Sequence, residues 1–295
     1  MAMFFELFLS GIMLGGLYAG MALGIVLLTK SSKIFNFSHG ILAVLGAYTI
    51  WAFTVKFELP VYITVVLTLA LTLALAISIE RVILRPLIGQ PLLSVILVTL
   101  GMGQFFSGLV TFIWPGTGRV FPEFLPSDGI EFMDMFFAQD RLISCLICIA
   151  VFVSFMLFFK YTRTGLAMRA TAEDPQLSQS RGIKVTRMFS QSWFIAILTA
   201  TITGLLLANL FGVEKNAIEE FTIKAFVVVI LGGMESIGGA LIAGLILGVV
   251  ESLISGYLDP FVGGGLSELV PFLVMLLVLV VKPYGLYGYV RIERV

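Results

Sequence analysis

The feature that most constrains the fold of this chain is a series of long, nearly uncharged apolar segments. They run over residues 7–29, 40–56, 60–80, 92–113, 142–160, 189–211, 222–233, 238–257 and 268–282. A helix needs about 20 mostly apolar residues to cross a bilayer, so the series predicts about 8–10 membrane segments. Charged residues make up only 12% of the chain, against roughly 25% in a soluble domain. We therefore expect an all-α polytopic membrane protein.

Two of these segments are special cases. The segment 222–233 is too short to cross alone as a regular helix, which indicates a half-helix or a re-entrant piece. The first segment begins almost at Met1, without a basic region or a small-residue cleavage site before it. This start favours a retained span over a signal peptide.

The loops between the segments divide by charge, which predicts how the chain is oriented in the membrane. Basic residues gather in one alternating set of loops, at Lys30, Lys33, Arg81, Arg85, Lys160, Arg163, Arg169, Arg181, Lys184, Arg187, Lys282, Arg291 and Arg294. Acidic residues gather in the other set, at Glu58, Glu123, Asp128, Glu131, Asp134, Asp140, Glu214, Glu219, Glu220, Asp259 and Glu268. Because lysine and arginine in short loops mark the cytoplasmic side, we expect the N-terminus outside and the C-terminus in the cytoplasm. This placement of the two termini on opposite sides of the membrane holds if 222–233 counts as a crossing.

The cytoplasmic loop at about 161–188 carries the signals of a short, capped helix. Asp174 followed by Pro175 is typical of an N-cap with proline at the first helical position. Gly182 suits the residue just past the helix end, and the apolar Ile183 is placed to fold back on the turn. Such a helix is suited to contacting a partner. Arg169 is expected to contact that partner, whereas Lys184 and Arg187 would either contact it or hold the loop at the anionic inner leaflet.

On the opposite side, the outer loop at about 114–140 is rich in proline and glycine and then acidic. It is too short for an independent domain and is expected to lie across the outer mouth. Two interpretations remain open, namely contact with an external binding protein and an ordered lid.

Small residues recur every four positions in two segments. They stand at Gly11 and Gly15, at Gly16, Gly20 and Gly24, and at Ala240, Gly244 and Gly248. Such faces let helix backbones approach closely, and packing within the bundle is favoured over a dimer contact.

Two stretches interrupt the apolar pattern. Residues 34–40 contain Asn36 and the single histidine, His39, and residues 231–239 contain a glycine-rich break. The polar or flexible positions of that break are Gly232, Gly233, Glu235 and Ser236. Interrupted helices often mark a transport pathway, and the charge pattern places both breaks on the cytoplasmic side, as expected for an inner gate. His39 could equally be a hydrogen-bonded residue at a helix start.

Glu251 is an acid set well inside an otherwise apolar segment. Intramembrane carboxylates usually face a bundle interior or water, which predicts a pathway-lining or inter-helix hydrogen-bonding role. The alternative is that its side chain reaches the outer surface through the nearby end of the segment. Gln104 and Asn209 are lesser polar candidates.

The chemistry that the chain lacks argues against an enzyme. No GxxxxGK[ST], HExxH or GxSxG occurs. One histidine and two cysteines, Cys145 and Cys148 inside an apolar run, make a poor zinc site, and the cysteines are expected to be packing residues. We expect no metal, no cofactor bound by this chain and no nucleic-acid partner.

Five blocks of the sequence resemble the permease subunits of branched-chain amino acid ABC importers. They are NFSHGILAVLGAY at 36–48, LRPL at 84–87, GLAMRATAEDPQLSQSRGI at 165–183, KAFVVVILGGMESIGGALIAGLILGVVE at 224–251 and KPYGLYG at 282–288. The resemblance implies a bundle of the type II importer kind, with residues 1–295 as one transmembrane permease domain in a bacterial inner membrane. It also implies a second related permease, two cytoplasmic ATPase subunits that bind ATP and magnesium, and a periplasmic binding protein.

The resemblance assigns the central loop to ATPase coupling. The matching positions are Gly165, Met168, Arg169, Asp174, Pro175, Gly182 and Ile183. It implies that the apolar side chains of Leu166, Met168, Leu177 and Ile183 seat in a groove of the ATPase. The glycine break departs from the family's usual GGxGS pattern, because Glu235 stands where a small residue is common.

Two other classes of function remain to be weighed. A secondary transporter driven by an ion gradient would need coupling acids near the midplane, for which Glu251 is the one good candidate. An intramembrane enzyme would need a polar catalytic cluster at a membrane face, which the sequence does not supply. Within the permease hypothesis, leucine, isoleucine and valine are the family default, with urea, short amides or other amino acids as alternatives.

Overall fold

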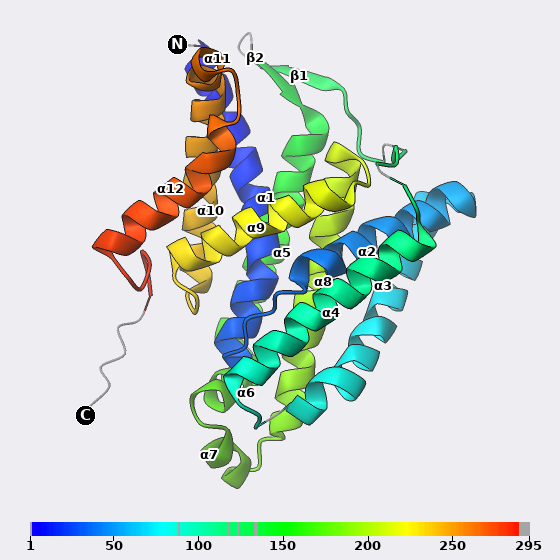
Figure 1. Ribbon diagram of the computed structural model, residues 1–295, viewed down its shortest axis with the longest axis vertical. Helices are drawn as coiled ribbons and strands as arrows, with labels where there is room; N and C mark the ends of the chain where they lie inside the picture. The colour runs from blue at the N-terminus through cyan, green and yellow to red at the C-terminus, as the bar shows by residue number, and fades with distance from the viewer. Residues whose placement is uncertain (1, 88, 117, 123, 133–134, 289–295) are drawn as a thin grey trace. The chain divides into compact units, whose positions relative to one another are not determined.

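The computed structural model describes residues 2–87, 89–116, 118–122, 124–132 and 135–288 (Figure 1). Four charged residues used in the orientation argument, Glu123, Asp134, Arg291 and Arg294, lie outside this described part.

Within the described residues, seven helical stretches are long and apolar enough to cross a membrane. They are built on α1 (Ala2–Ser32), α2 (His39–Trp51), α3 (Val61–Ile79), α4 (Leu92–Ile113), α5 (Gln139–Tyr161), α8 (Val185–Phe211) and α10 (Ile237–Tyr257). A shorter apolar helix, α12 (Leu266–Val281), follows them. The prediction of a multi-pass helical membrane protein is confirmed.

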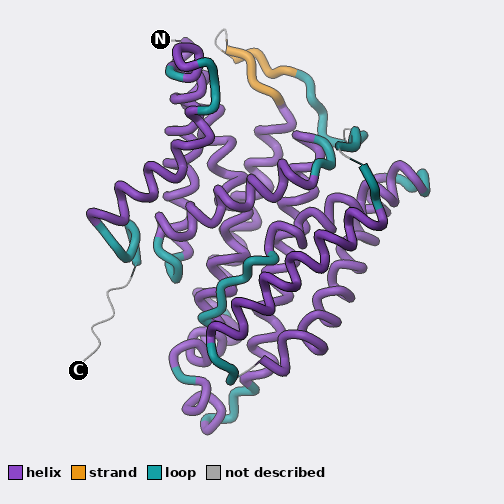
Figure 2. The backbone as a smooth tube through the Cα atoms, in the orientation of Figure 1, coloured by secondary structure: helices purple, strands orange, loops and turns teal. Residues whose placement is uncertain are grey.

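The remaining elements connect these helices along the chain. Figure 2 colours the helices, strands and loops separately. They are the π-helical turns η1 (Ala52–Lys56) and η2 (Glu80–Leu84), the 3₁₀ turn η3 (Arg85–Leu87), and helices α6 (Arg163–Glu173), α7 (Pro175–Ser180), α9 (Lys215–Gly232) and α11 (Asp259–Val262). Two strands, β1 (Gly129–Phe132) and β2 (Met135–Ala138), pair antiparallel with Gly129 opposite Ala138. This small hairpin lies in the predicted outer loop and is an exception to the all-α expectation.

The short segment predicted over 222–233 is corrected by the structure. It is the C-terminal part of α9, an 18-residue helix that begins at Lys215. The turns before residue 222 include Glu219 and Glu220, which are polar but favour helix. The first residue of the apolar run therefore did not mark the first residue of the helix.

The Cα positions divide the chain into two compact units, with boundaries inside α1, α5 and α9 and in the loop between Phe124 and Leu125. Unit 1 comprises residues 1–26, 125–153 and 223–295, and unit 2 comprises residues 27–124 and 154–222.

In unit 1, α1 packs against α10 through the predicted small-residue faces. A Cβ added to Gly15 would lie 2.6 Å from the Gly244 carbonyl oxygen, and one added to Gly11 would lie 2.6 Å from the Val249 Cα. The two backbones therefore touch, which confirms packing within the chain for these positions. Cys145 is buried beside Met13, as expected of a packing residue.

In unit 2, α2 and α8 make the corresponding close contact. A Cβ on Gly46 would lie 2.9 Å from the Thr201 Cγ2, and Gly204 leaves no room for one against the backbone of Ala43. By contrast, α3 and α4 are poorly covered by the rest of the chain. In each of these two spans, only 28% of an 18-residue apolar stretch is buried. These two helices therefore present most of their surface outward.

Candidate functional site

The predicted coupling loop begins with α6, which is held against the end of α5. The hydroxyl of Thr162 accepts a hydrogen bond from the Gly165 backbone N–H at 3.0 Å and so caps the helix. A Cβ on Gly165 would lie 2.7 Å from the Phe158 carbonyl oxygen. Gly165 is therefore required by space rather than by backbone freedom.

Helix α7 has the caps that the sequence predicts. The Asp174 carboxylate accepts from the Leu177 N–H at 2.9 Å, and Pro175 is the first helical residue. At the other end, Gly182 has φ +82° and donates to the Gln179 carbonyl, while the Ile183 N–H donates to the Ser178 carbonyl, both at 3.0 Å. These two bonds form a Schellman motif. The prediction of a structured loop is confirmed.

The side chains of the loop divide into inward and outward sets. Met168 is only 1% exposed, so the expectation that it reaches a partner's groove is wrong for this structure. The Arg169 guanidinium donates to the Lys160 carbonyl at 3.2 Å and lies 5.9 Å from the Phe159 ring centroid, which binds α6 to α5. Leu166 and Leu177 are exposed and remain available to a partner.

The charge of this surface is positive. Arg163, Arg181, Lys184 and Arg187 are all exposed. Glu173 faces Lys33 at 3.9 Å, but this pair adds little stability because the Glu173 carboxylate is exposed to solvent.

The polar stretch before α2 is buried. The Asn36 side-chain oxygen accepts from the Ser38 N–H at 3.0 Å and from the Ser38 hydroxyl at 2.7 Å, forming the turn that precedes His39. His39 opens α2 and is fully buried. Asn36 thus shapes the turn before α2, while both roles predicted for His39, in the gate or as a hydrogen-bonded residue at the helix start, stay predictions.

The glycine-rich break is a tight crossing of backbones. A Cβ on Gly232 would lie 2.5 Å from the Gly239 carbonyl carbon, and Gly233 has φ +101°. Ser236 caps α10, because its hydroxyl accepts from the Gly239 N–H at 3.1 Å. The break therefore depends on glycine both for space and for conformation.

The segment after α12 closes this break. The Leu286 N–H donates to the Leu231 carbonyl at 2.8 Å, and the Tyr287 N–H donates to the Gly232 carbonyl at 3.2 Å. These bonds satisfy the last carbonyls of α9, which a helix end leaves unpaired. Sequence reasoning identified residues 282–288 only as a block of resemblance and missed this contact. Glu235 is half-buried and lines, with Met234 and Tyr284, a cavity of about 290 Å³.

Glu251 is buried and bonded on both carboxylate oxygens. The Tyr18 hydroxyl donates to Oε2 and the Lys224 ammonium to Oε1, each at 2.7 Å. The inter-helix hydrogen-bonding interpretation is supported, and the alternative that Glu251 reaches the surface is wrong. Neither Tyr18 nor Lys224 was singled out from the sequence. A lysine inside the apolar segment 222–233 was the available signal.

The outer loop is ordered where it meets α2 and α8. The Trp51 indole donates to the Val120 carbonyl at 3.2 Å, and the Arg119 guanidinium carbon lies 4.4 Å from the Trp51 ring centroid. Arg119 and Val213 exchange two backbone hydrogen bonds, and the Asn209 side chain accepts from the Phe124 N–H at 3.0 Å. The ordered-loop interpretation is supported here, and contact with a binding protein stays a prediction.

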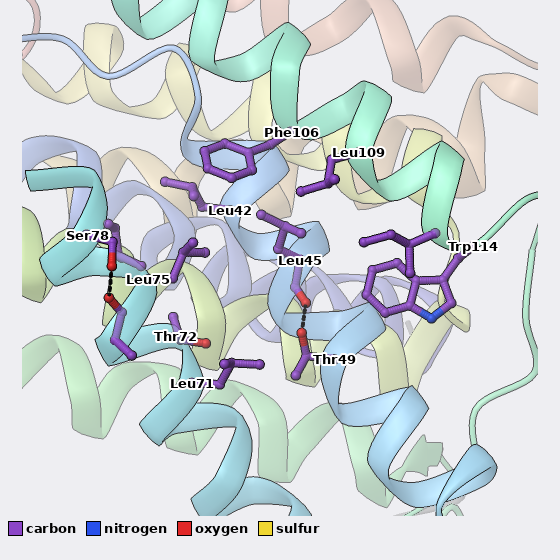
Figure 3. Close-up of a pocket in the computed structure, with 13 residues that line it drawn as sticks. Leu42, Leu45, Thr49, Leu71, Thr72, Leu75, Ser78, Phe106, Leu109 and Trp114 are labelled. Carbon is purple, nitrogen blue, oxygen red and sulfur yellow. Dashed lines mark hydrogen bonds between the residues drawn. The ribbon is translucent and has the colours of Figure 1, made fainter. Parts of the chain in front are cut away.

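An apolar cavity of about 360 Å³ lies among α2, α3 and α4 (Figure 3). Leu45, Leu75 and Phe106 are among its lining residues. Two of its hydroxyls bond within their own helices, since Thr49 donates to the Leu45 carbonyl and Ser78 to the Ala74 carbonyl. The apolar lining offers little to a charged ligand, and no sequence pattern predicted this cavity. Among the described residues, no group of three or more His, Cys, Asp or Glu side chains could hold a metal.

Comparison with known proteins gives matches over most of the chain. The sequence profile of a family described as "Branched-chain amino acid transport system / permease component" matches residues 7–279. The high-affinity branched-chain amino acid transport system permease protein LivH of Escherichia coli K12 is 30% identical, over 99% of this chain and 98% of that protein. BraD of Pseudomonas aeruginosa, which carries the same description, is 28% identical over 97% of this chain and 96% of its own length. A solved structure, PsaBC from Streptococcus pneumoniae in complex with Fab, aligns with a TM-score of 0.49 and 13% identity, covering 96% of this chain and 92% of that one.

Proposed function

Because the chain belongs to the permease family of branched-chain amino acid ABC transport systems, we propose that it carries leucine, isoleucine and valine into a bacterial cell through the inner membrane. Its named relatives are permease proteins of branched-chain amino acid transport, which supports this substrate class over urea or short amides. A periplasmic binding protein would deliver the substrate.

The complete transporter would contain a second related permease and two cytoplasmic ATPase subunits that bind ATP and magnesium. In this chain, residues 1–295 would act as one permease domain with a bundle of the type II importer kind, the N-terminus outside and the C-terminus in the cytoplasm. The loop at 161–188 would face the ATPases, and the loop at 114–140 would face the binding protein.

The α6–α7 loop is the observation that carries the coupling role. Both helices are capped, α6 is fixed to α5 through Gly165 and Arg169, and Leu166 and Leu177 project outward. A push on such a stiff loop is transmitted to the membrane helices instead of being absorbed by it. Asp174, Pro175, Gly182 and Ile183 would act by holding the loop's shape, whereas Leu166 and Leu177 would touch the ATPase.

The gate would involve Asn36, His39, Gly232, Gly233, Glu235, Ser236 and Glu251. The tight crossing of Gly232 with Gly239 and the closed break around Gly233 and Ser236 support a shut inner gate in this conformation. A secondary transporter remains the competing class, but Glu251 is paired with Lys224, which favours a role other than proton or cation coupling.

Leu177→Glu tests the coupling role. A carboxylate at this exposed apolar position opposes its burial against a partner, since removing an unpaired charge from water is costly. ATP-dependent uptake of L-leucine by the complete transporter in vesicles should fall at least tenfold, with insertion retained. Gln179→Glu adds the same charge to the same exposed helix and should leave uptake within twofold of the unmodified protein.

Two results would contradict the proposal. Equal uptake by the Leu177→Glu and Gln179→Glu variants would remove the ATPase contact from this surface. Uptake that persists without ATP but stops with an uncoupler would instead favour the secondary transporter.

A further inference from the structure

A buried cluster of three polar side chains in unit 1 has no role in the coupling scheme. It joins Tyr18 of α1, Lys224 of α9 and Glu251 of α10. The Lys224 and Glu251 side chains are 12% and 9% exposed, and their charged atoms lie 2.7 Å apart. Two of the three helices, α1 and α10, are candidate membrane spans.

Stability alone is a weak reason to keep full charges at this place. Removing two charges from water costs about as much as their attraction returns, and apolar residues of similar volume often serve as well. The contact between α1 and α10 is already made by their glycine faces. Charged residues inside membrane segments more often mark the path of a polar or charged solute.

The glycine contacts between α1 and α10 show how these helices orient the side chains of the cluster. Gly11 meets residues 248 and 249, whereas Gly15 meets Gly244, so α1 and α10 run antiparallel. Side chains on a helix lean toward its N-terminus, and Tyr18 and Glu251 therefore lean toward each other across this contact. The carboxylate is thus held by a rigid helix pair, and the ammonium is brought to it by a third helix, α9.

We propose that Lys224 and Glu251 form a binding site for the zwitterionic head group of the transported amino acid, an inference that rests on the proposed function. The substrate's ammonium would bind Glu251, and its carboxylate would bind Lys224. All four charges are then paired, so that binding leaves no unpaired charge in an apolar place. Each step is an exchange of ion-pair partners without proton transfer or covalent change.

In this structure the two residues of the site bind each other and so leave no place for a substrate. The Lys224 ammonium occupies the place of the substrate's ammonium, and the Glu251 carboxylate occupies that of its carboxylate. Admission of the substrate requires α9 to move away from α10. Tyr18 keeps its hydrogen bond to Oε2 throughout and acts as a positioning residue for the carboxylate.

The double variant K224M/E251Q tests this site in the complete transporter. It removes both charges together, so that neither is left buried alone, and the new amide oxygen still accepts from Tyr18. Assembly, measured as the size of the detergent-extracted complex, should be retained, and L-leucine uptake should fall at least tenfold. The control K215M/E219Q removes one lysine and one glutamate from the same helix and should keep uptake within twofold. Uptake within twofold by K224M/E251Q as well would overturn the proposal and make the pair structural.

A second measurement uses the unmodified protein and does not depend on how the variant folds. The permease–ATPase complex without binding protein is heated with L-leucine, with 4-methylpentanoate, which lacks the ammonium, or with 3-methylbutylamine, which lacks the carboxylate. L-leucine alone should raise the unfolding midpoint, because only a bound ligand stabilises the folded state. An equal rise with either analogue, or no rise with L-leucine, contradicts the site. Absence of L-leucine uptake by the unmodified transporter would instead contradict the proposed function.

Discussion

At the scale of single residues, glycine sets how closely the helices of each unit approach one another. The glycines at the contact of α1 with α10, such as Gly15 and Gly248, are helical, so their value lies in the missing side chain and not in backbone freedom. Gly182 and Gly233, in contrast, have φ of +82° and +101°, where other residues are strained. The sequence alone does not distinguish these two kinds of glycine. The residues packed around each glycine and its backbone angle do so.

Two glycines at different places on α10 separate the effect of packing from that of helix propensity. A Cβ on Gly248 would lie 2.6 Å from the Gly15 Cα, whereas one on Gly238 meets no atom within 4 Å. Gly248→Ala should therefore lower stability, by about 1–3 kcal/mol as for other overpacked sites. Gly238→Ala should be neutral or stabilising, by up to about 1 kcal/mol, because alanine favours helix. Thermal unfolding of the two purified variants in detergent gives the comparison. Equal midpoints would contradict the close contact of α1 with α10.

At the scale of elements, the α6–α7 loop shows how short helices are made rigid without a large core. Its ends are fixed by side-chain caps at Thr162 and Asp174 and by the glycine turn at Gly182. These signals are local, which is why the few residues at the two ends of α7 were enough to predict it. The orientation of Arg169 depends on its contacts with α5, and the burial of Met168 depends on packing between distant segments, neither of which the local sequence could supply.

Gly182→Val tests whether rigidity of this loop matters for coupling. A β-branched residue at φ +82° costs about 1–2 kcal/mol and should open the Schellman turn. The ratio of L-leucine transported to ATP hydrolysed should fall several-fold, with membrane insertion unchanged. Gly182→Asn is the matched control, because asparagine tolerates this conformation, and it should keep most of the ratio. A ratio unchanged by valine would show that the turn is dispensable for coupling.

At the scale of the whole molecule, the periodicity of apolar segments predicted the membrane helices because each must satisfy its own backbone in lipid. The same reasoning failed at α9, where polar first turns extend a helix beyond its apolar run. It also failed at contacts between distant segments. The bonds from Leu286 and Tyr287 to the end of α9, and the ion pair of Lys224 with Glu251, join residues whose local sequences carry no sign of each other.

The predicted orientation can be checked with single cysteines at exposed positions. Val120→Cys lies in the outer loop and Gln176→Cys on α7, both exposed. The native Cys145 and Cys148 are 4% and 1% exposed and should give little background. In intact cells, a small maleimide that does not cross the inner membrane should label Val120→Cys alone. Gln176→Cys should react only after that membrane is opened, and the reverse pattern would invert the charge-based orientation.

The closing of the glycine break by the segment after α12 has a consequence for the order of biosynthesis. The carbonyls of Leu231 and Gly232 receive their partners from Leu286 and Tyr287, which the ribosome adds only after α10, α11 and α12. Until then, the end of α9 must be hydrated or bound to something else. The nascent protein therefore passes through a stage in which the spans are present but this turn is open, and a chain arrested before residue 286 would remain at that stage.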